Sequence, residues 1–200
     1  KWSDTRFVIG GYTNTNSSNP YDAFLASIDS TGNFAIKRKL VSTSKSEKIV
    51  DMKVITTTAG VTELYFLMEV GLNQATTDVN MAFGKATLTT SAINIDFIKE
   101  YSTSVYSLVD GSLVFDEFNE CYISATLRLK SDSTQRDSFW VCKVSKTGSI
   151  IWNYRYVAPG RDITMADRSS IDIFGDLNLA FSRHNTTTGV KTVDSVKIGY

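Results

Sequence analysis

The chain has 200 residues, of which 42% are hydrophobic and 12% aromatic, a composition that excludes intrinsic disorder and suffices for a buried core. Its 21 Lys and Arg residues balance its 21 Asp and Glu residues, so the formal net charge is zero, which argues against nucleic acid as a partner. No apolar run reaches the roughly 18 residues that a membrane-spanning helix needs, so we expect no membrane span.

Short segments rich in β-branched and aromatic residues, separated by polar loops, follow one another along the chain. Only two prolines occur, and no stretch has the 3.6-residue period of a helix. We therefore predict an all-β protein. The predicted strands, in chain order, lie at 6–12, 22–33 (with a turn closing on glycine), 34–40, 49–55, 64–70, 79–88, 93–101, 107–115, 122–128, 138–149 (with a similar turn), 150–156, 170–174, 180–184 and 193–200.

These segments repeat at an interval of 58 residues. Four comparable strands place Phe7, Tyr65, Ile123 and Phe181 at that spacing, and the turn glycines Gly32 and Gly148 are twice as far apart. Four short strands per repeat of this length are typical of a β-propeller blade. We predict that residues 1–200 are part of a single β-propeller of four-stranded antiparallel blades, with units at about 6–63, 64–121 and 122–179 and an incomplete one at 180–200.

The predicted packing of a blade agrees with this pattern. Neighbouring blades cover both faces of the middle strands, so segments such as 65–68 and 139–144 should be apolar on both sides, whereas the outermost strands, such as 34–40, should be mixed. About three and a third units are fewer than the 4 to 8 blades of a closed propeller. The chain is then either a fragment of a longer one, which we favour, or an open array that closes against another copy.

Two segments carry a resemblance to a known repeat. The strand 7–13, ending in Gly-Tyr-Thr, is followed by Asp22-Ala-Phe-Leu-Ala-Ser-Ile-Asp-Ser-Thr-Gly-Asn33, and the third unit adds a strand containing Trp152. This pattern resembles the SBBP repeat, a bacterial-type β-propeller repeat, although the second unit lacks most of it. The resemblance implies a propeller that is often extracellular or surface-associated, with no shared catalytic residues.

The residues that could carry chemistry are few. His184 is the only histidine and has no nucleophile motif around it, so we expect a strand-end side chain. Cys121 and Cys142 cannot form a metal site with a single histidine. With a hairpin centred near Ser133, residue 121 faces about 145 and residue 142 about 124, which places the two thiols on opposite faces. A slip of one residue in the pairing would reverse this and permit a disulfide.

Carboxylates are the remaining candidates, because glycosidases use two of them. Asp110, Asp116 and Glu117 flank a predicted inner strand, and Asp51 and Asp172 lie near the corresponding strands of other units. Asp51, Asp110 and Asp172 do not share one 58-residue spacing, so the sequence does not establish a ring of acids. We therefore name no catalytic, cofactor-binding or metal-binding residue, and expect no cofactor.

Two sequons, at Asn16 and Asn185, lie in polar loops and are candidate N-glycosylation sites. With the neutral charge and the absence of catalytic motifs, they favour a non-catalytic structural, adhesive or assembly module, extracellular or at the cell surface. Its partners would be other protein chains or further copies of itself. Two alternatives stay open: a carbohydrate-active hydrolytic propeller with funnel carboxylates, and an intracellular protein-interaction scaffold.

Overall fold

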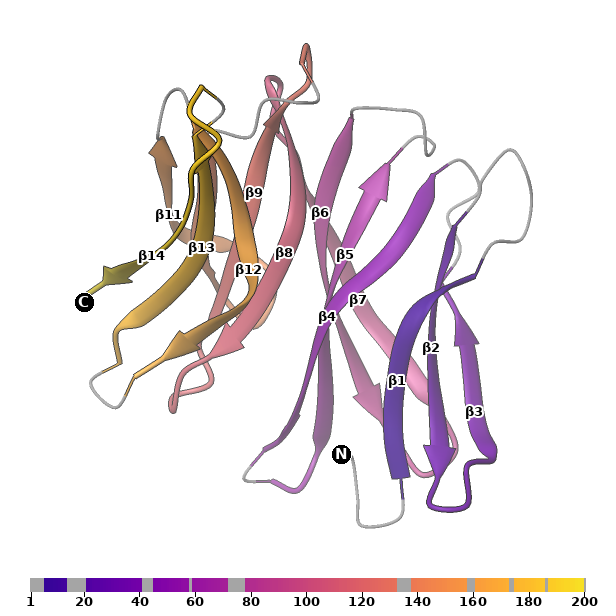
Figure 1. Cartoon of the computed structure of the whole chain (residues 1–200). Coiled ribbons are helices and arrows are strands. Elements are labelled where there is room, and N and C mark those ends of the chain that lie inside the picture. Colours follow the sequence, from indigo (N-terminus) through magenta and orange to yellow (C-terminus); the bar gives the residue numbers. More distant parts are fainter. Residues whose placement is uncertain are drawn as a thin grey trace. The chain divides into compact units, whose positions relative to one another are not determined.

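The computed structural model describes residues 6–13, 21–40, 45–57, 59–71, 78–132, 138–157, 161–172, 175–185 and 187–199, and for Lys39 and 161–168 it describes the backbone alone. Within these ranges the regular structure is entirely β, as predicted, and it forms four antiparallel sheets (Figure 1). Of the described residues, none belongs to a helix long and apolar enough to cross a membrane.

The sheets follow one another along the chain, and each is built from consecutive strands in sequence order. The first contains β1 (Arg6–Thr13), β2 (Asp22–Asp29) and β3 (Phe34–Lys39). The second contains β4 (Ser46–Thr56), β5 (Thr62–Gly71), β6 (Val79–Leu88) and β7 (Ile93–Tyr101). The third contains β8 (Tyr106–Phe115), β9 (Cys121–Leu129), β10 (Ser138–Val144) and β11 (Ile150–Val157). The fourth contains β12 (Arg161–Ile171), β13 (Leu177–Asn185) and β14 (Lys191–Ile198).

The chain divides into two compact units. The first unit comprises Lys1–Thr76 and Met81–Tyr101, and so holds the first two sheets. The second comprises Thr77–Asn80 and Ser102–Tyr200, and holds the last two.

Burial follows strand position as predicted from the sequence. Every residue of β10 is buried, and the central residues of β5 and β9 are buried on both faces. The last strands of the two four-stranded sheets, β7 and β11, are largely exposed. One face of the middle strands packs against the second sheet of the same unit. The last strand of each four-stranded sheet is paired with a neighbour on one side only.

Each unit has its own apolar core. In the first unit, Leu25 of β2 and Phe66 of β5 belong to one cluster that includes side chains of both sheets. The ring of Phe66 packs onto Gly84 of β6, where an added Cβ would lie only 2.1 Å from a ring carbon. In the second unit, Phe139 of β10 and Phe181 of β13 have ring centroids 5.3 Å apart and join its two sheets.

One turn recurs at five hairpins. In each, the first residue donates its N–H to the carbonyl of the fifth, and the fourth donates its N–H to the carbonyl of the first. The fourth residue has a positive φ, which glycine adopts without strain and asparagine tolerates. A side-chain oxygen of the first residue accepts the N–H of the fifth. The five turns begin at Asp29, Thr57, Asp116, Ser145 and Asp172.

The turns measure the repeat independently of the strands. From Thr57 to Asp116 the step is 59 residues and from Asp116 to Asp172 it is 56, so the interval varies about the predicted 58. The turn at Asp29 corresponds to the turn at Ser145. The Ser145 turn joins β10 to β11, the third and fourth strands of the third sheet. When the sheets are aligned on these turns, β1–β3 match the second to fourth strands of a four-stranded sheet, and β12–β14 match the first to third.

Two predictions of local structure are wrong. The strand expected at 170–174 is instead β12, Arg161–Ile171, which ends where that prediction begins; its polar sequence has no clear alternation. The pairing of β9 with β10 is also one residue away from the expected register, since Cys121 lies opposite Val144 and Cys142 opposite Ile123. Both thiols therefore share a face as diagonal neighbours, and both are buried and not joined in a disulfide. Diagonal positions are about 7–8 Å apart, too far for a disulfide.

Candidate functional site

The first strand of each of the last three sheets contains a β-bulge. In β4 the register shifts between Ile49 and Asp51, and in β8 it shifts between Val109 and Ser112. In β12 the shift lies between Met165 and Ser169. Bulges redirect side chains and are frequent next to active sites, so these segments are the first places to look for chemistry.

Asp110 lies inside the β8 bulge and has a φ of 54°, a left-handed conformation that a residue other than glycine seldom adopts. Its side chain is exposed. Such a backbone costs of order 1–3 kcal/mol and persists only where the surrounding structure enforces it, and strain of this kind gathers at functional sites. Asp110 is thus an exposed carboxylate held on a strained backbone within a sheet.

Asp51 is the counterpart of Asp110 in the first unit. The two are 59 residues apart, the same step as that between the turns at Thr57 and Asp116. Asp51 is half-buried, and its Oδ1 accepts the N–H of Met52 at 2.7 Å. A constant 58-residue spacing does not relate these two aspartates, because the repeat here is one residue longer.

The two bulges of the second unit lie side by side. Ser112 closes the β8 bulge and Ser169 closes the β12 bulge, and their Oγ atoms are 3.0 Å apart. The N–H of Ser169 also donates to Ser112 Oγ at 3.2 Å, and Ser124 of β9 brings a third hydroxyl within 3.5 Å of Ser169 Oγ. Figure 1 shows β8 and β12 running next to each other. Residues 166–168 form the β12 bulge, so this bulge includes Asp167.

The other carboxylates singled out from the sequence belong to turns. Asp116 is buried in the turn between β8 and β9, where its Oδ1 accepts the N–H groups of Phe118 and Glu120 at 2.9 and 2.8 Å. Asp172 accepts the N–H of Asp176 in the turn between β12 and β13 and forms an ion pair with Lys197. Glu117 is exposed within the Asp116 turn. The hydrogen bonds of Asp116 and Asp172 assign both to turn structure, away from the bulges.

The remaining sequence candidates do not gather into a site. His184 is a half-buried residue near the end of β13, opposite Lys191. Burial raises the pKa of the Cys142 thiol far above its usual value, which makes it a poor nucleophile. Within the described ranges, no group of three or more His, Cys, Asp and Glu side chains could hold a metal ion.

Of the two sequons, Asn16 lies outside the described residues. Asn185 ends β13, and its Oδ1 accepts the N–H groups of Thr187 and Thr188 at 3.0 and 3.1 Å. Its amide oxygen therefore orders the hairpin before β14. Glycosylation of either asparagine stays a prediction.

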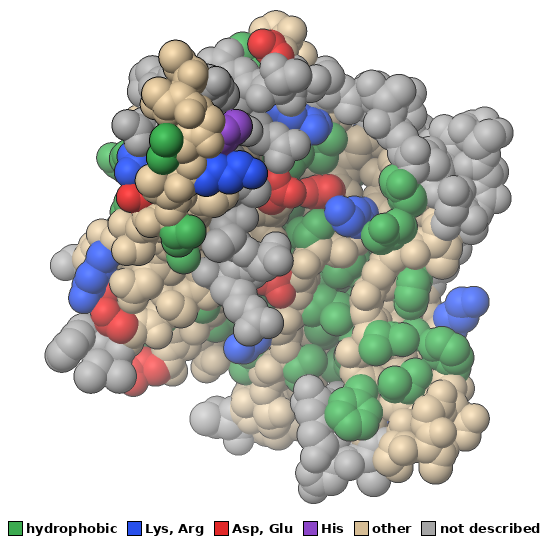
Figure 2. All heavy atoms as spheres, in the orientation of Figure 1, with side chains coloured by type: hydrophobic (Ala, Val, Ile, Leu, Met, Phe, Trp, Pro, Cys, Tyr) green, Lys and Arg blue, Asp and Glu red, His purple; other side chains and the backbone are tan. Residues whose placement is uncertain are grey.

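Figure 2 shows hydrophobic side chains gathered over the β1–β3 sheet. Two large side chains of this sheet are exposed: Phe7 of β1 is 41% exposed, and Phe34 at the start of β3 is 65% exposed. These side chains carry no acid, base or nucleophile, so they are not candidates for a catalytic site.

No family model and no curated protein matches the sequence. The resemblance to the SBBP repeat therefore stays a prediction.

Solved structures do resemble the chain. A GH43 β-1,3-galactosidase matches 97% of the chain with a TM-score of 0.54 and 8% identity, over 44% of its own length. A second GH43 β-1,3-galactosidase, solved with galactodeoxynojirimycin, matches 96% with a TM-score of 0.52 and 7% identity, over 73% of its length. An exo-β-1,3-galactanase from Clostridium thermocellum matches 96% with a TM-score of 0.53 and 10% identity, over 46% of its length.

These likenesses show that the fold is that of a β-propeller, as predicted. The chain spans less than half the length of two of the three proteins. The leading functional prediction, a non-catalytic structural or adhesive module, is contradicted, because the propellers that the chain resembles are glycoside hydrolases. The alternative weighed from the sequence, a hydrolytic propeller, agrees better with the comparison. The absence of a catalytic motif in the sequence does not exclude a hydrolase, because two carboxyl groups from separate strands leave no local signature.

Proposed function

We propose that this chain is part of a carbohydrate-active hydrolase that cleaves glycosidic bonds with aspartates on the first strands of its sheets. The observation that carries the proposal is the contact between the β8 and β12 bulges in the second unit. Ser112 and Ser169 close these bulges and touch, and an aspartate, Asp110 or Asp167, lies two residues before each of them. In the first unit, Asp51 directly follows the bulge of β4.

The chemistry needs few groups. Glycoside hydrolysis uses two carboxyl groups that flank the glycosidic bond. One, as the acid, gives its proton to the bridging oxygen while the bond from that oxygen to the anomeric carbon breaks. The other, as the carboxylate, either takes a proton from the water that attacks the anomeric carbon or attacks this carbon itself. Asp110 has the exposure that such a role requires.

The choice of substrate class draws on the structural neighbours. Three similar structures with TM-scores above 0.5 are β-1,3-galactosidases and an exo-β-1,3-galactanase. A β-1,3-linked galactan is therefore the first substrate to test. A panel of other neutral glycans should accompany it, because a shared fold does not determine the sugar.

The direct test is release of sugar by the purified protein and by its Asp110→Asn variant. We expect hydrolysis of at least one glycan, and a fall in kcat of about 100-fold or more in the variant, since a positioned acid or base contributes about 10²–10⁴-fold. Asp167→Asn should be measured as well, because Asp167 is the candidate for the second carboxyl within the same unit.

Asp29→Asn is the matched control. It changes an aspartate of the same charge in the turn between β2 and β3, where Oδ1 accepts the N–H groups of Thr31 and Asn33. We expect its kcat to equal that of the unmodified protein. No hydrolysis of any glycan by the unmodified protein would contradict the proposal. So would full activity of Asp110→Asn with intact folding.

A further inference from the structure

A pocket of about 340 Å³ lies in the second unit, away from the bulges. It opens between β11 and β14, the strands farthest from β8 and β12 in their respective sheets. Its walls come from four strands, and the residues that form them include Tyr122, Trp152, Tyr154, Leu177 and Ile198. A cavity of this size falls within the range of small-molecule sites, about 300–1,000 Å³.

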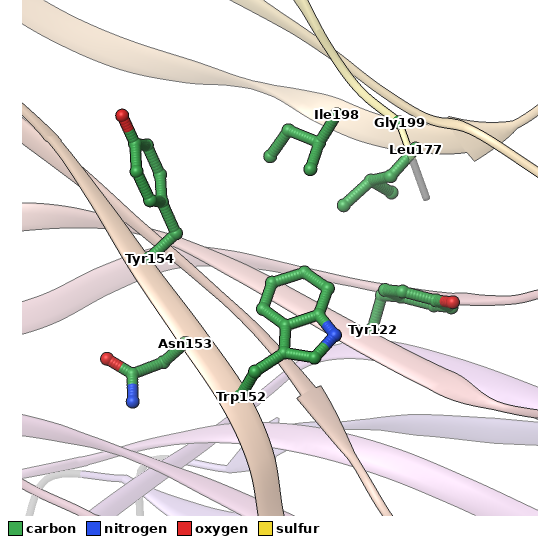
Figure 3. A pocket seen from close by; sticks show the side chains of 7 residues that line it. All are labelled: Tyr122, Trp152, Asn153, Tyr154, Leu177, Ile198 and Gly199. Carbon is green, nitrogen blue, oxygen red and sulfur yellow. The ribbon is translucent and has the colours of Figure 1, made fainter.

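Aromatic rings form one side of the pocket. Trp152 and Tyr154 are two residues apart on β11, so both side chains point to the same face, as Figure 3 shows. Asn153, between them, points away from the rings in the same view. Leu177 and Ile198 lie across the opening from the two rings.

The ring of Trp152 is held in place from behind. It meets the buried ring of Tyr122 in an edge-on contact, with centroids 6.1 Å apart. The hydroxyl of Tyr122 in turn donates to Asp116 Oδ2 at 3.3 Å. The position of Trp152 is thus set by packing against an ordered residue before any ligand arrives, which is the condition for a preformed site.

The exposure of the aromatic rings distinguishes this pocket from ordinary core packing. Tyr154 is 55% exposed although its ring lines an apolar pocket, and Trp152 is only partly covered. Two neighbouring aromatic rings left open to solvent on one face of a strand retain apolar area that a bound ring could cover.

The lining indicates the chemistry of the occupant. Among the residues that line the pocket none is charged, so a charged ligand would lose its hydration without gaining an ion pair. The ring of an uncharged pyranose is a chair that presents C–H groups on its faces and hydroxyl groups around its edge. The C–H faces suit the negative faces of aromatic rings, and the edge hydroxyls suit the Tyr154 hydroxyl and the Trp152 indole N–H.

We propose that this pocket binds one neutral sugar ring of a glycan, stacked on Trp152 and Tyr154, as an accessory site separate from the bulge aspartates. The proposal rests on the proposed function only in the choice of glycan to test. It predicts that the protein holds a polysaccharide at a second point, so that loss of the pocket weakens action on long chains more than on short ones.

The indole N–H signals of the three tryptophans provide the test. In a ¹⁵N-labelled Asp110→Asn protein, Trp152→Phe identifies the Trp152 signal. β-1,3-Galactotriose and matched glucose and arabinose trisaccharides are then added. We expect one of them to shift the Trp152 signal with saturation, while the signal of Trp140, a buried residue of β10, stays in place.

The affinity is then compared between variants. Tyr154→Ala should raise the Kd at least tenfold, while Phe118→Ala, which removes a 73% exposed ring in the turn between β8 and β9, should leave it unchanged. Unchanged dispersion of the remaining signals shows that each variant is folded. The proposal is overturned if no trisaccharide shifts the Trp152 signal, or if Tyr154→Ala binds as well as the parent protein.

The outcome is independent of catalysis. Saturable binding at Trp152 in a protein that hydrolyses no glycan would preserve the accessory site and remove the proposed function. Hydrolysis that depends on Asp110, without any shift at Trp152, would do the reverse. If both stand, Tyr154→Ala in the active protein should lower kcat/KM on the polymer severalfold and leave it unchanged on a disaccharide.

Discussion

The turn at Asp116 permits a quantitative test of how these sheets are held together. Asp116 is buried, and its carboxylate accepts two backbone N–H groups at 2.9 and 2.8 Å and the Tyr122 hydroxyl at 3.3 Å. Asp116→Ala removes the two acceptor atoms and with them all three hydrogen bonds. A hydrogen bond to a charged group contributes about 1.5–3 kcal/mol, but the N–H of exposed Phe118 regains water after the substitution. We expect the free energy of unfolding to fall by about 2–3 kcal/mol.

Ser145→Ala is the matched substitution. Ser145 begins an equivalent turn between β10 and β11, and its Oγ accepts the N–H groups of Thr147 and Ser149 at 3.3 and 3.0 Å. Because this acceptor is neutral and partly exposed, we expect a loss of about 1 kcal/mol or less. Asp116→Asn keeps an acceptor oxygen without the charge and should lie between the two.

The assay is urea unfolding followed by tryptophan fluorescence in a Trp2→Phe background. The remaining tryptophans, Trp140 and Trp152, both belong to the second unit, as does Asp116, so the signal reports the unit that is changed. The slope of the transition should be the same in all variants, so that the midpoints report stability. The reasoning is refuted if Asp116→Ala costs no more than Ser145→Ala.

Two further predictions concern single groups. Cys121 and Cys142 are both buried, and burial raises the pKa of Cys142, so neither thiol should react with iodoacetamide in the native protein. In urea, mass spectrometry should find both thiols alkylated. Rapid labelling of the native protein would contradict the packing. The Thr31 hydroxyl and the Asn33 N–H lower the pKa of Asp29 below its usual value of about 3.9. The contribution of Asp29 to stability is therefore complete above that value and is lost as the pH falls through its lower folded pKa; a carboxyl titration by NMR with a midpoint at or above 3.9 would show that the turn does not form as described.

Local patterns in the sequence predicted several elements closely. The segments 79–88 and 93–101 are strands with those bounds, because one is apolar on both sides and the other alternates. The equivalence of Gly32 and Gly148 is also confirmed, since each is the fourth residue of a five-residue turn and has a positive φ. A turn of this kind is encoded within five residues, so no knowledge of the tertiary structure is needed to recognise it.

The candidate site was visible only in part. Asp110 and Asp51 were named from the sequence, but Asp116 and Asp172 stood beside them as equals. The hydrogen bonds that Asp116 and Asp172 accept within turns show that this pair has a structural role. The former pair is equivalent because the turns that follow Asp51 and Asp110 are separated by the same 59 residues as the two aspartates. Trp152 was noted as part of a repeat, with no sign that it lines a pocket.

By itself, the sequence determined the all-β class, the repeat near 58 residues and the chemistry of the turns, because alternation and turn hydrogen bonds depend on neighbours along the chain. The tertiary structure alone decided the register of Cys121 and Cys142, the course of β12 and the contact between the two bulges. These depend on which strands pair and at what offset. A shift of one residue costs little in local sequence preference, yet it moves every side chain of a strand to the opposite face.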